Sequence, residues 1–427
     1  MGLSVDSGRF ALLQRSRHSG NSEALAPPPG HPRFPSADGV RAIAIACVLA
    51  VHSWAATRVL APQSAPDGIG DRLLAHLNVG VAIFFALSGF LLYRPFIAGD
   101  LALGPRPSAA AYLWRRGLRI LPAYWLALGA LALVPGDTAR AGDGVWAVLP
   151  LQGLAPAGER SCVELIATCR FAPVWSLTVE LTFYALLPAY ATLMSRVPRR
   201  QRLPCELLVL GTLAAVSTAV GVADATARLT LVSGTVAGHF PPFAAGMLAA
   251  VLSARREERL RTPSPTLKRL LATAAALLVY SAAAMALPPS PFLFTARDRL
   301  IAHLAFAVIA TCALVPLLVE TPGRPARSLL ASRPLRALGL VSYGIFLWHY
   351  TFALAAVDLR IASWPLSLVF VSACSLVPAT ASYLLVERPA LRLKNALWGR
   401  FPTTREAPRP PAAPSASHQP SLALRDD

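Results

Sequence analysis

The sequence predicts an all-α integral membrane protein with about ten transmembrane helices and both termini in the cytoplasm. Of its 427 residues, 55% are hydrophobic and only 15% are charged, and the mean hydropathy is +0.51. The apolar residues gather in long runs, and arginines gather in every second connection between these runs. This composition is too apolar for a water-soluble domain of the same length, so the expected solvent is the bilayer.

Ten runs are long enough to span a membrane, because a helix needs roughly 20 apolar residues to cross roughly 30 Å of hydrocarbon. Bounded by charged residues or proline, the runs are 38–59, 78–97, 114–134, 172–194, 205–223, 233–254, 267–287, 299–319, 336–357 and 362–386. We expect each run to form one transmembrane helix.

Basic residues mark alternate connections, as short cytoplasmic loops do in multi-pass membrane proteins. They are Arg9, Arg15, Arg17 and Arg33, then Arg106, Arg115 and Arg116, then Arg196, Arg199, Arg200 and Arg202, then Arg255, Arg256, Arg259, Arg261 and Lys268, and finally Arg324, Arg327, Arg333 and Arg336. This pattern predicts a multi-pass protein with both termini in the cytoplasm, and we expect it in the plasma or inner membrane. The net charge of +18 forms no single basic face, so we expect no nucleic-acid partner.

Two polar segments flank the predicted membrane domain of residues 36–390. Residues 1–35 are basic and rich in proline, and they lack the apolar core of a signal peptide. Residues 391–427 turn to proline, alanine and serine. Neither segment can bury much apolar surface, so we expect two disordered cytoplasmic tails.

The connection at about 135–171 is the longest and is expected to face outward. It contains Cys162 and Cys169, which could form a disulfide in an oxidising compartment or remain two free thiols. The other four cysteines lie in or beside apolar runs and are expected to pack there.

The first run carries Asp38, Arg41 and His52, and ionisable residues inside a membrane are costly enough to suggest a function. Eleven helical residues advance roughly 16 Å and return to nearly the same face, so Arg41 and His52 share one stripe. Asp38 lies one turn before Arg41 and can orient its guanidinium group. A neutral His52 could act as a general base towards a hydroxyl group, or it could simply bond to a neighbouring helix.

Arg116 and Arg119 lie one turn apart at the start of the third run. Two guanidinium groups at this spacing could clamp a phosphate or pyrophosphate. They could equally be anchors that hold the helix at the cytoplasmic boundary.

Ser88 and Gly89 form a small pair in the middle of the second run. Such a pair permits close helix packing, and it could alternatively leave room for a thin ligand arm.

Glu180 lies about two turns inside the fourth run, where a carboxyl group must be protonated or paired. It could partner a buried cation or belong to an acceptor site. His349 in the ninth run could bind the acceptor or link helices. His239 and His303 have less polar context, and we assign them structural roles.

Several motifs together resemble the acyltransferase 3 family of multi-pass membrane O-acyltransferases, and the resemblance covers roughly residues 36–390. The motifs are Asp38-Gly39-Val40-Arg41 with His52, Phe84-Phe85-Ala86-Leu87-Ser88-Gly89-Phe90, Arg116 and Arg119 before Ile120 and Pro122, Trp175-Ser176-Leu177 with Glu180, Ser342-Tyr343 with Leu347-Trp348-His349, and Glu387-Arg388-Pro389. Two departures stand out: Leu181 and Thr182 follow Glu180 where relatives carry a further Glu or Gln, and the C-terminal tail is too short for the hydrolase-like domain of many relatives.

The resemblance implies an acyl-CoA donor entering from the cytoplasm and an acceptor hydroxyl on a glycan, a lipid-linked sugar or a natural product such as a macrolide. It implies no permanently bound cofactor and no metal, and it leaves homodimerisation open. The expected catalytic residues are His52, Arg41, Asp38 and Glu180. The expected donor-binding residues are Arg116, Arg119, Ser88 and Gly89, and the expected acceptor-binding residues are Trp175, Ser176 and His349.

A proton-coupled secondary transporter is the alternative, because buried His and Glu residues on ten spans also suit proton-coupled export. Transporters of that class commonly show matching halves with broken helices, and the sequence shows no such pairing.

Overall fold

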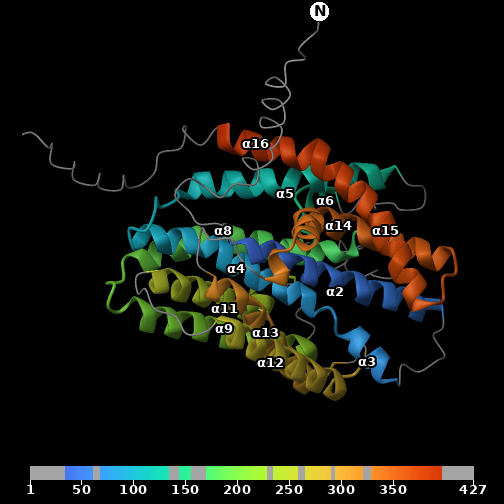
Figure 1. Cartoon of the computed structure of the whole chain (residues 1–427), viewed down its shortest axis with the longest axis horizontal. Coiled ribbons are helices and arrows are strands. Elements are labelled where there is room, and N and C mark those ends of the chain that lie inside the picture. The colour runs from blue at the N-terminus through green and yellow to red at the C-terminus, as the bar shows by residue number, and fades with distance from the viewer. Residues whose placement is uncertain are drawn as a thin grey trace, which may run out of the picture.

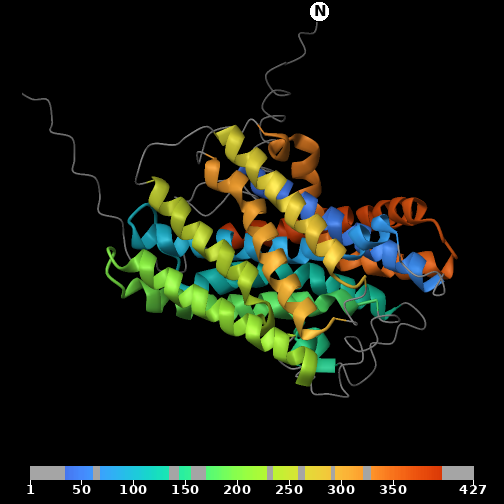
Figure 2. The same ribbon diagram turned by 90° about the horizontal axis from the view of Figure 1, so that it is seen from below.

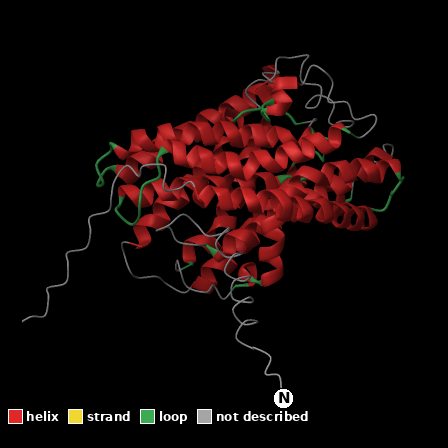
Figure 3. Ribbon diagram, turned by 90° about the horizontal axis from the view of Figure 1, so that it is seen from above, coloured by secondary structure: helices red, strands yellow, loops and turns green. Residues whose placement is uncertain are grey.

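A computed structural model describes residues 34–60, 68–133, 144–154, 170–227, 234–257, 265–289, 294–320 and 328–396. These segments are helices joined by loops and turns, and they contain no strand (Figure 3). The predicted all-α class is therefore confirmed for the described residues. Cys162 and Cys169, and most of both predicted tails, lie outside them.

Ten long helices form the body of the described chain, with shorter helical segments between them. The long helices are α2 (Pro35–Leu60), α4 (Val79–Asp100), α5 (Ala109–Ala132), α8 (Trp175–Ser195), α9 (Arg202–Ala227), α11 (Val236–Glu257), α12 (Pro265–Ala286), α13 (Ala296–Val319), α14 (Arg333–Asp358) and α15 (Trp364–Ser382). The short ones are α3 (Ile69–Ala75), α6 (Gly144–Val148), η2 (Gln152–Leu154), η3 (Ala172–Val174), η5 (Leu329–Ala331), the π-helix η6 (Tyr383–Glu387) and α16 (Arg388–Ala396).

Nine helical segments of the described chain are long and apolar enough to cross a membrane. Each overlaps one predicted run. The remaining run, 114–134, corresponds to α5, whose Arg115, Arg116 and Arg119 make its first half strongly charged. The structure thus packs one helix with a charged first half among nine more uniformly apolar ones.

Two helix boundaries differ from the predicted ones. The side chain of Ser108 accepts a hydrogen bond from the backbone N–H of Ala111, so α5 begins at Ala109, earlier than the predicted position 114. At the other end of the chain, η6 and α16 continue from α15 to Ala396. Residues 391–396 of the predicted disordered tail are therefore helical.

The helices pack into one bundle in which α4 contacts α11 and α2 contacts α14 most extensively. In Figure 1, α5 and α16 lie along one edge, and α9, α12 and α13 lie along the opposite edge. Figure 2 shows α12 and α13 side by side, inclined to the green helices. Large side chains that include Phe90, Tyr93 and Phe243 fill the centre of the main core.

Close packing between α4 and α11 depends on glycine. A Cβ atom at Gly246 would lie 2.0 Å from the carbonyl oxygen of Ala86, and one at Gly89 would lie 2.4 Å from that of Phe243. Small residues at such crossings let helix backbones approach closely in membranes. Of the two interpretations of Gly89, the structure shows the packing role.

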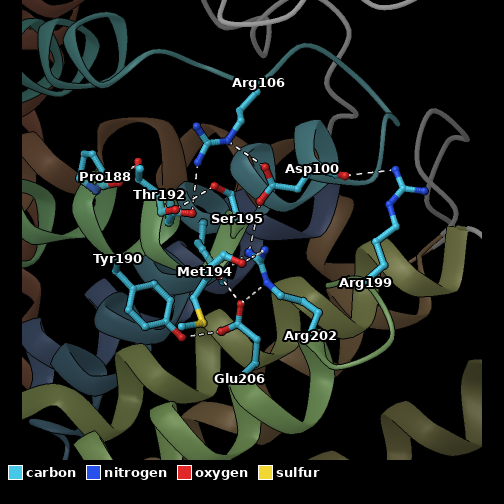
Figure 4. Close-up of polar contacts among 12 residues, drawn as sticks. Asp100, Arg106, Pro188, Tyr190, Thr192, Met194, Ser195, Arg199, Arg202 and Glu206 are labelled. Carbon is cyan, nitrogen blue, oxygen red and sulfur yellow. Dashed lines mark hydrogen bonds and ion pairs between the residues drawn. The ribbon is translucent and has the colours of Figure 1, made fainter. Parts of the chain in front are cut away.

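A buried polar cluster joins α4, α8 and α9 (Figure 4). The Glu206 carboxylate is fully buried. It accepts hydrogen bonds from Tyr93 and, at 2.5 Å, from Tyr190, and it pairs with Arg202 at 2.9 Å. Arg202 also pairs with Asp100 at 3.2 Å. Arg202, which the sequence suggested as a loop residue, is therefore part of a closed internal network.

The α4–α11 contact yields a stability prediction. Gly246→Ala should lower the stability by about 1–3 kcal/mol, because the new methyl group meets backbone rather than a flexible side chain. Gly211→Ala is the matched control, since a Cβ atom there meets nothing within 4 Å; it should leave stability unchanged or raise it by roughly 0.4–1 kcal/mol. Thermal unfolding of the purified protein in detergent measures both, and equal midpoints for the two variants would contradict the packing role.

Candidate functional site

A pocket with about 880 Å³ of empty space lies between α2, α4, α5, α8 and α14. Its apolar lining includes Phe84, Phe85 and Phe346. Its charged and hydroxyl-bearing lining consists of Arg41, Ser88, Arg116, Arg119, Ser176, Glu180, Tyr184, Ser342 and Tyr343. Three guanidinium groups and one carboxyl group thus share a cavity within an apolar bundle.

Glu180 lies on the wall of this pocket, and it is hydrogen-bonded to a neighbouring helix. The Ser88 hydroxyl on α4 donates to Glu180 Oε1 at 2.6 Å. Tyr184, one turn further along α8, also contacts the carboxyl group, and Arg116 and Arg41 lie near enough to interact with it electrostatically. Glu180 therefore links α4 and α8 on the polar side of the pocket.

The three arginines differ in how they are held. Arg41 pairs with Asp38 at 2.7 Å, as the spacing on α2 predicted. Arg119 pairs at 3.4 Å with the buried Glu387 of η6. Arg116 Nε is buried and has no hydrogen-bond partner among the described residues. An acceptor oxygen from a ligand in the pocket would satisfy this donor.

His52 and His349 contact each other and do not line this pocket. His52 Nδ1 lies 3.1 Å from His349 Nε2, and the two ring centroids are 4.9 Å apart. His349 is fully buried. The structure therefore joins two histidines that the sequence had placed in separate catalytic and acceptor-binding roles.

The hydrogen bonds around this histidine pair assign the ring protons. A carbonyl oxygen can only accept, so His349 Nδ1 donates to the carbonyl oxygen of Phe346 at 2.7 Å. His349 Nε2 is then an acceptor in a neutral ring, and His52 Nδ1 is the donor that faces it. The same His52 nitrogen lies 3.0 Å from the carbonyl oxygen of Val48, which also requires a donor. His52 Nε2 is left as the unprotonated, basic nitrogen.

An aromatic layer separates the pocket from the histidine pair. Phe84 and Phe346 line the pocket, and they also pack against the apolar cluster that contains Val48 and Tyr350. The Tyr350 ring lies 5.2 Å from the His52 ring. Because Arg41 and His52 are eleven residues apart on α2, their backbones are separated by roughly 16 Å along the helix axis.

The predicted site residues thus fall into two groups. Those that line the pocket are Arg41, Arg116, Arg119, Ser88, Glu180 and Ser176. Those that lie outside its lining are Asp38, which holds Arg41, and His52, His349, Gly89 and Trp175. Trp175 lines a neighbouring cavity instead.

Four polar residues of the site were not among those predicted: Tyr184, Ser342 and Tyr343, which line the pocket, and Glu387. The Tyr343 hydroxyl lies in the pocket and donates to the carbonyl oxygen of Ile120 at 3.0 Å. Glu387 anchors Arg119. Tyr343 and Glu387 belong to motifs visible in the sequence, Ser342-Tyr343-Gly344 and Glu387-Arg388-Pro389. The polar residue in each motif could have been singled out from the sequence. Its partner on another helix could not.

Comparison with known proteins adds a family relationship. Residues 34–385 match a family described as an acyltransferase domain, acyltransferase 3. YrhL of Bacillus subtilis, provisionally named a peptidoglycan O-acetyltransferase, is 26% identical over 393 residues, which cover 84% of this chain and 55% of YrhL. BcsY of Komagataeibacter xylinus, provisionally named a membrane-bound transacylase, is 27% identical, with 84% of this chain and 83% of BcsY covered.

The peptidoglycan O-acetyltransferase OatA of Listeria monocytogenes is 24% identical, with 74% of this chain and 49% of OatA covered. The chain therefore spans about half the length of YrhL and of OatA, and most of the length of BcsY. No solved structure matches the chain significantly.

Proposed function

This chain belongs to the acyltransferase 3 family, and from that premise we propose that it transfers a short acyl group, such as acetyl, from acyl-CoA to an acceptor hydroxyl. It is a multi-pass membrane acyltransferase. The family relationship favours an enzyme over the transporter alternative. The proposal concerns the identity of the acyl donor, the identity of the acceptor and the roles of the site residues.

The observation that carries the proposal is the pocket with three arginines. Coenzyme A bears phosphate groups, and guanidinium groups bind phosphate oxygens through charge-assisted, bidentate hydrogen bonds. Arg41 and Arg119 each have a protein carboxylate partner, whereas Arg116 Nε has no hydrogen-bond partner among the described residues. An incoming phosphate would supply the acceptor that Arg116 needs, so the residues present fit the donor.

The position of these arginines supports donor entry from the cytoplasm. Arg41 lies near the start of α2, and Arg116 and Arg119 lie near the start of α5. Both helix starts follow segments that the distribution of positive charge places in the cytoplasm. In this proposal acyl-CoA enters there, and its thioester extends along α2 towards His52.

His52 is proposed as the general base. Its Nε2 accepts the proton of the acceptor hydroxyl while the hydroxyl oxygen forms a bond to the thioester carbonyl carbon. The carbon–sulfur bond then breaks, and the departing sulfur takes up the proton. His349 holds His52 in the tautomer that leaves Nε2 free, and movement of the Phe84 and Phe346 side chains would open the path from the pocket.

The acceptor is proposed to be a glycan, a lipid-linked sugar or a hydroxyl-bearing natural product. The names of YrhL and OatA refer to O-acetylation of peptidoglycan. Those relatives support a carbohydrate acceptor in particular. Incubating membranes that contain the protein with acyl-CoA and candidate glycans, and detecting the acylated product by mass spectrometry, tests the proposed reaction.

Arg116→Ala should raise the KM for acyl-CoA by about 10- to 100-fold, the loss expected for charged hydrogen bonds to a phosphate group. Arg116→Lys should restore only part of the affinity, because an ammonium group cannot bind two oxygens in the same plane. Arg200→Ala is the control, since this exposed arginine lies outside the pocket. Steady-state kinetics with varied acyl-CoA measure all three variants, and an unchanged KM in Arg116→Ala would argue against the donor assignment.

His52→Ala should reduce kcat by about 10²- to 10⁴-fold, the usual contribution of a general base. Glu180→Gln keeps the acceptor oxygen for Ser88 and should reduce kcat by less than about tenfold. Initial rates at saturating acyl-CoA and acceptor compare the two variants. The reverse order of effects would transfer the role of base from His52 to Glu180.

A further inference from the structure

A second cavity lies beside the donor pocket and has about 1070 Å³ of empty space. The two cavities share Val81 and Phe85 of α4 as a common wall. The two cavities are also adjacent on α8, where Trp175 lines the second cavity and Ser176 lines the first. A ligand in the second cavity would therefore lie next to a ligand in the first.

The second cavity is built at the beginnings of four helices. Asn78 precedes α4, Trp175 begins α8, His239 lies in the first turn of α11, and Arg299 lies in the first turn of α13. The topology predicted from the charge distribution places these four beginnings at the outer side of the membrane.

The beginning of α4 lies partway along α2. Gly80 of α4 lies against Ala44 of α2, and Phe90 of α4 contacts Phe34 before α2. The two helices are therefore antiparallel, and α4 begins beside Ala44, roughly 13 Å along α2 from its first residue. On α4 the second cavity is lined by residues 78–85 and the first by residues 81–92, so the second cavity lies nearer the beginning of α4 than the donor pocket does.

Aromatic and hydrogen-bonding groups lie side by side on the wall of this cavity. The Trp175 and His239 rings are 5.1 Å apart, and the His239 and His303 rings are 6.4 Å apart. Phe294 and Phe306 complete the apolar lining. Flat apolar faces combined with a few polar groups are typical of small-ligand sites.

Two buried polar atoms of the lining have no hydrogen-bond partner in the described part of the chain: Asn78 Oδ1 and His303 Nδ1. Both residues line the cavity. An amide oxygen can only accept, so it needs a donor from a ligand, and a hydroxyl group can serve as donor or acceptor for an imidazole nitrogen. A ligand with several hydroxyl groups would pair with both atoms.

The local backbone holds His239 in place. Its φ and ψ angles of −133° and 20° interrupt the helix, and Pro241 and Pro242 follow immediately. Proline has no N–H group to donate to the carbonyl oxygen four residues earlier, so Pro241 and Pro242 favour a break in the first turns of α11. His239 and His303, to which the sequence suggested only structural roles, are therefore positioned on a cavity wall.

We infer that this second cavity is a subsite for a carbohydrate acceptor, and that it binds a sugar ring next to the ring whose hydroxyl group extends towards His52. The inference rests on the proposed function, because it identifies the substrate class of the same enzyme. A sugar ring offers an apolar face to Trp175 and several hydroxyl groups to Asn78 and His303. The acyl-CoA donor fits less well here, since the lining holds one arginine against three in the first pocket.

Binding and kinetics of the full-length protein in nanodiscs test the inference. The probes are cellotetraose and a tetrasaccharide of N-acetylglucosamine, titrated by isothermal calorimetry in the absence of acyl-CoA. His303→Ala and Asn78→Ala should each weaken binding of the preferred tetrasaccharide by about tenfold, the effect of one buried hydrogen bond. Trp175→Phe, which keeps an aromatic face, should bind more tightly than Trp175→Ala.

Leu304→Ala is the matched control, because Leu304 follows His303 and is exposed on the outside of α13. It should bind the tetrasaccharide as the unmodified protein does. In steady-state assays, His303→Ala should raise the KM for the glycan and leave the KM for acyl-CoA unchanged. A rise in the KM for acyl-CoA alone would make the cavity part of the donor site and overturn the inference.

Failure of the two proposals can be told apart. Tetrasaccharide binding that depends on His303 without any acyl transfer would support the subsite and contradict the proposed reaction. Acyl transfer to a glycan that is insensitive to His303, Asn78 and Trp175 would support the reaction and contradict the subsite. Binding of neither tetrasaccharide in calorimetry would also count against the subsite.

Discussion

Charged groups inside the apolar bundle need partners from the protein or from a ligand, because hydrocarbon offers them none. The structure meets this constraint in two contrasting ways. Around Glu206 the network is closed: two tyrosines and Arg202 satisfy the carboxylate, and Arg202 pairs in turn with Asp100. In the pocket between α2, α5 and α8 the network is open, since Arg116 Nε lacks a partner within the described chain. We propose that the closed network holds the bundle together and the open one receives the donor.

The open network and the histidine pair lie at different depths of the same helices. On α2 and α14, contacts of Gly339 with Asp38 and of His349 with His52 show that the two helices run in the same direction. The pocket lies near the first of these contacts and the histidines lie at the second. A reaction that uses both therefore needs a donor with its anionic end at the arginines and its reactive end some three helical turns away. Acyl-CoA has this extended shape, which is why the proposal assigns it to the site.

The sequence was sufficient for much of the fold, because hydrophobic run length reports directly on membrane-spanning helices. The Asp38–Arg41 pair was also predictable, since both residues lie on one helix at a spacing that brings them together. Contacts between helices could not be predicted from the sequence. The bond from Ser88 to Glu180, the pairing of Arg119 with Glu387 and the contact of His52 with His349 join segments far apart in the chain. The aromatic layer between Arg41 and His52 is likewise a product of tertiary packing, so one helical stripe on α2 could not reveal it.

Photo-crosslinking with an acyl-CoA that carries a diazirine in its acyl chain tests the donor site most directly. We expect crosslinks to Phe84 on α4 and to Tyr343 and Phe346 on α14, which lie between the arginines and the histidines. These crosslinks should disappear when unlabelled acyl-CoA competes. Crosslinks confined to other helices, or crosslinks that persist under competition, would contradict a donor bound in the arginine pocket.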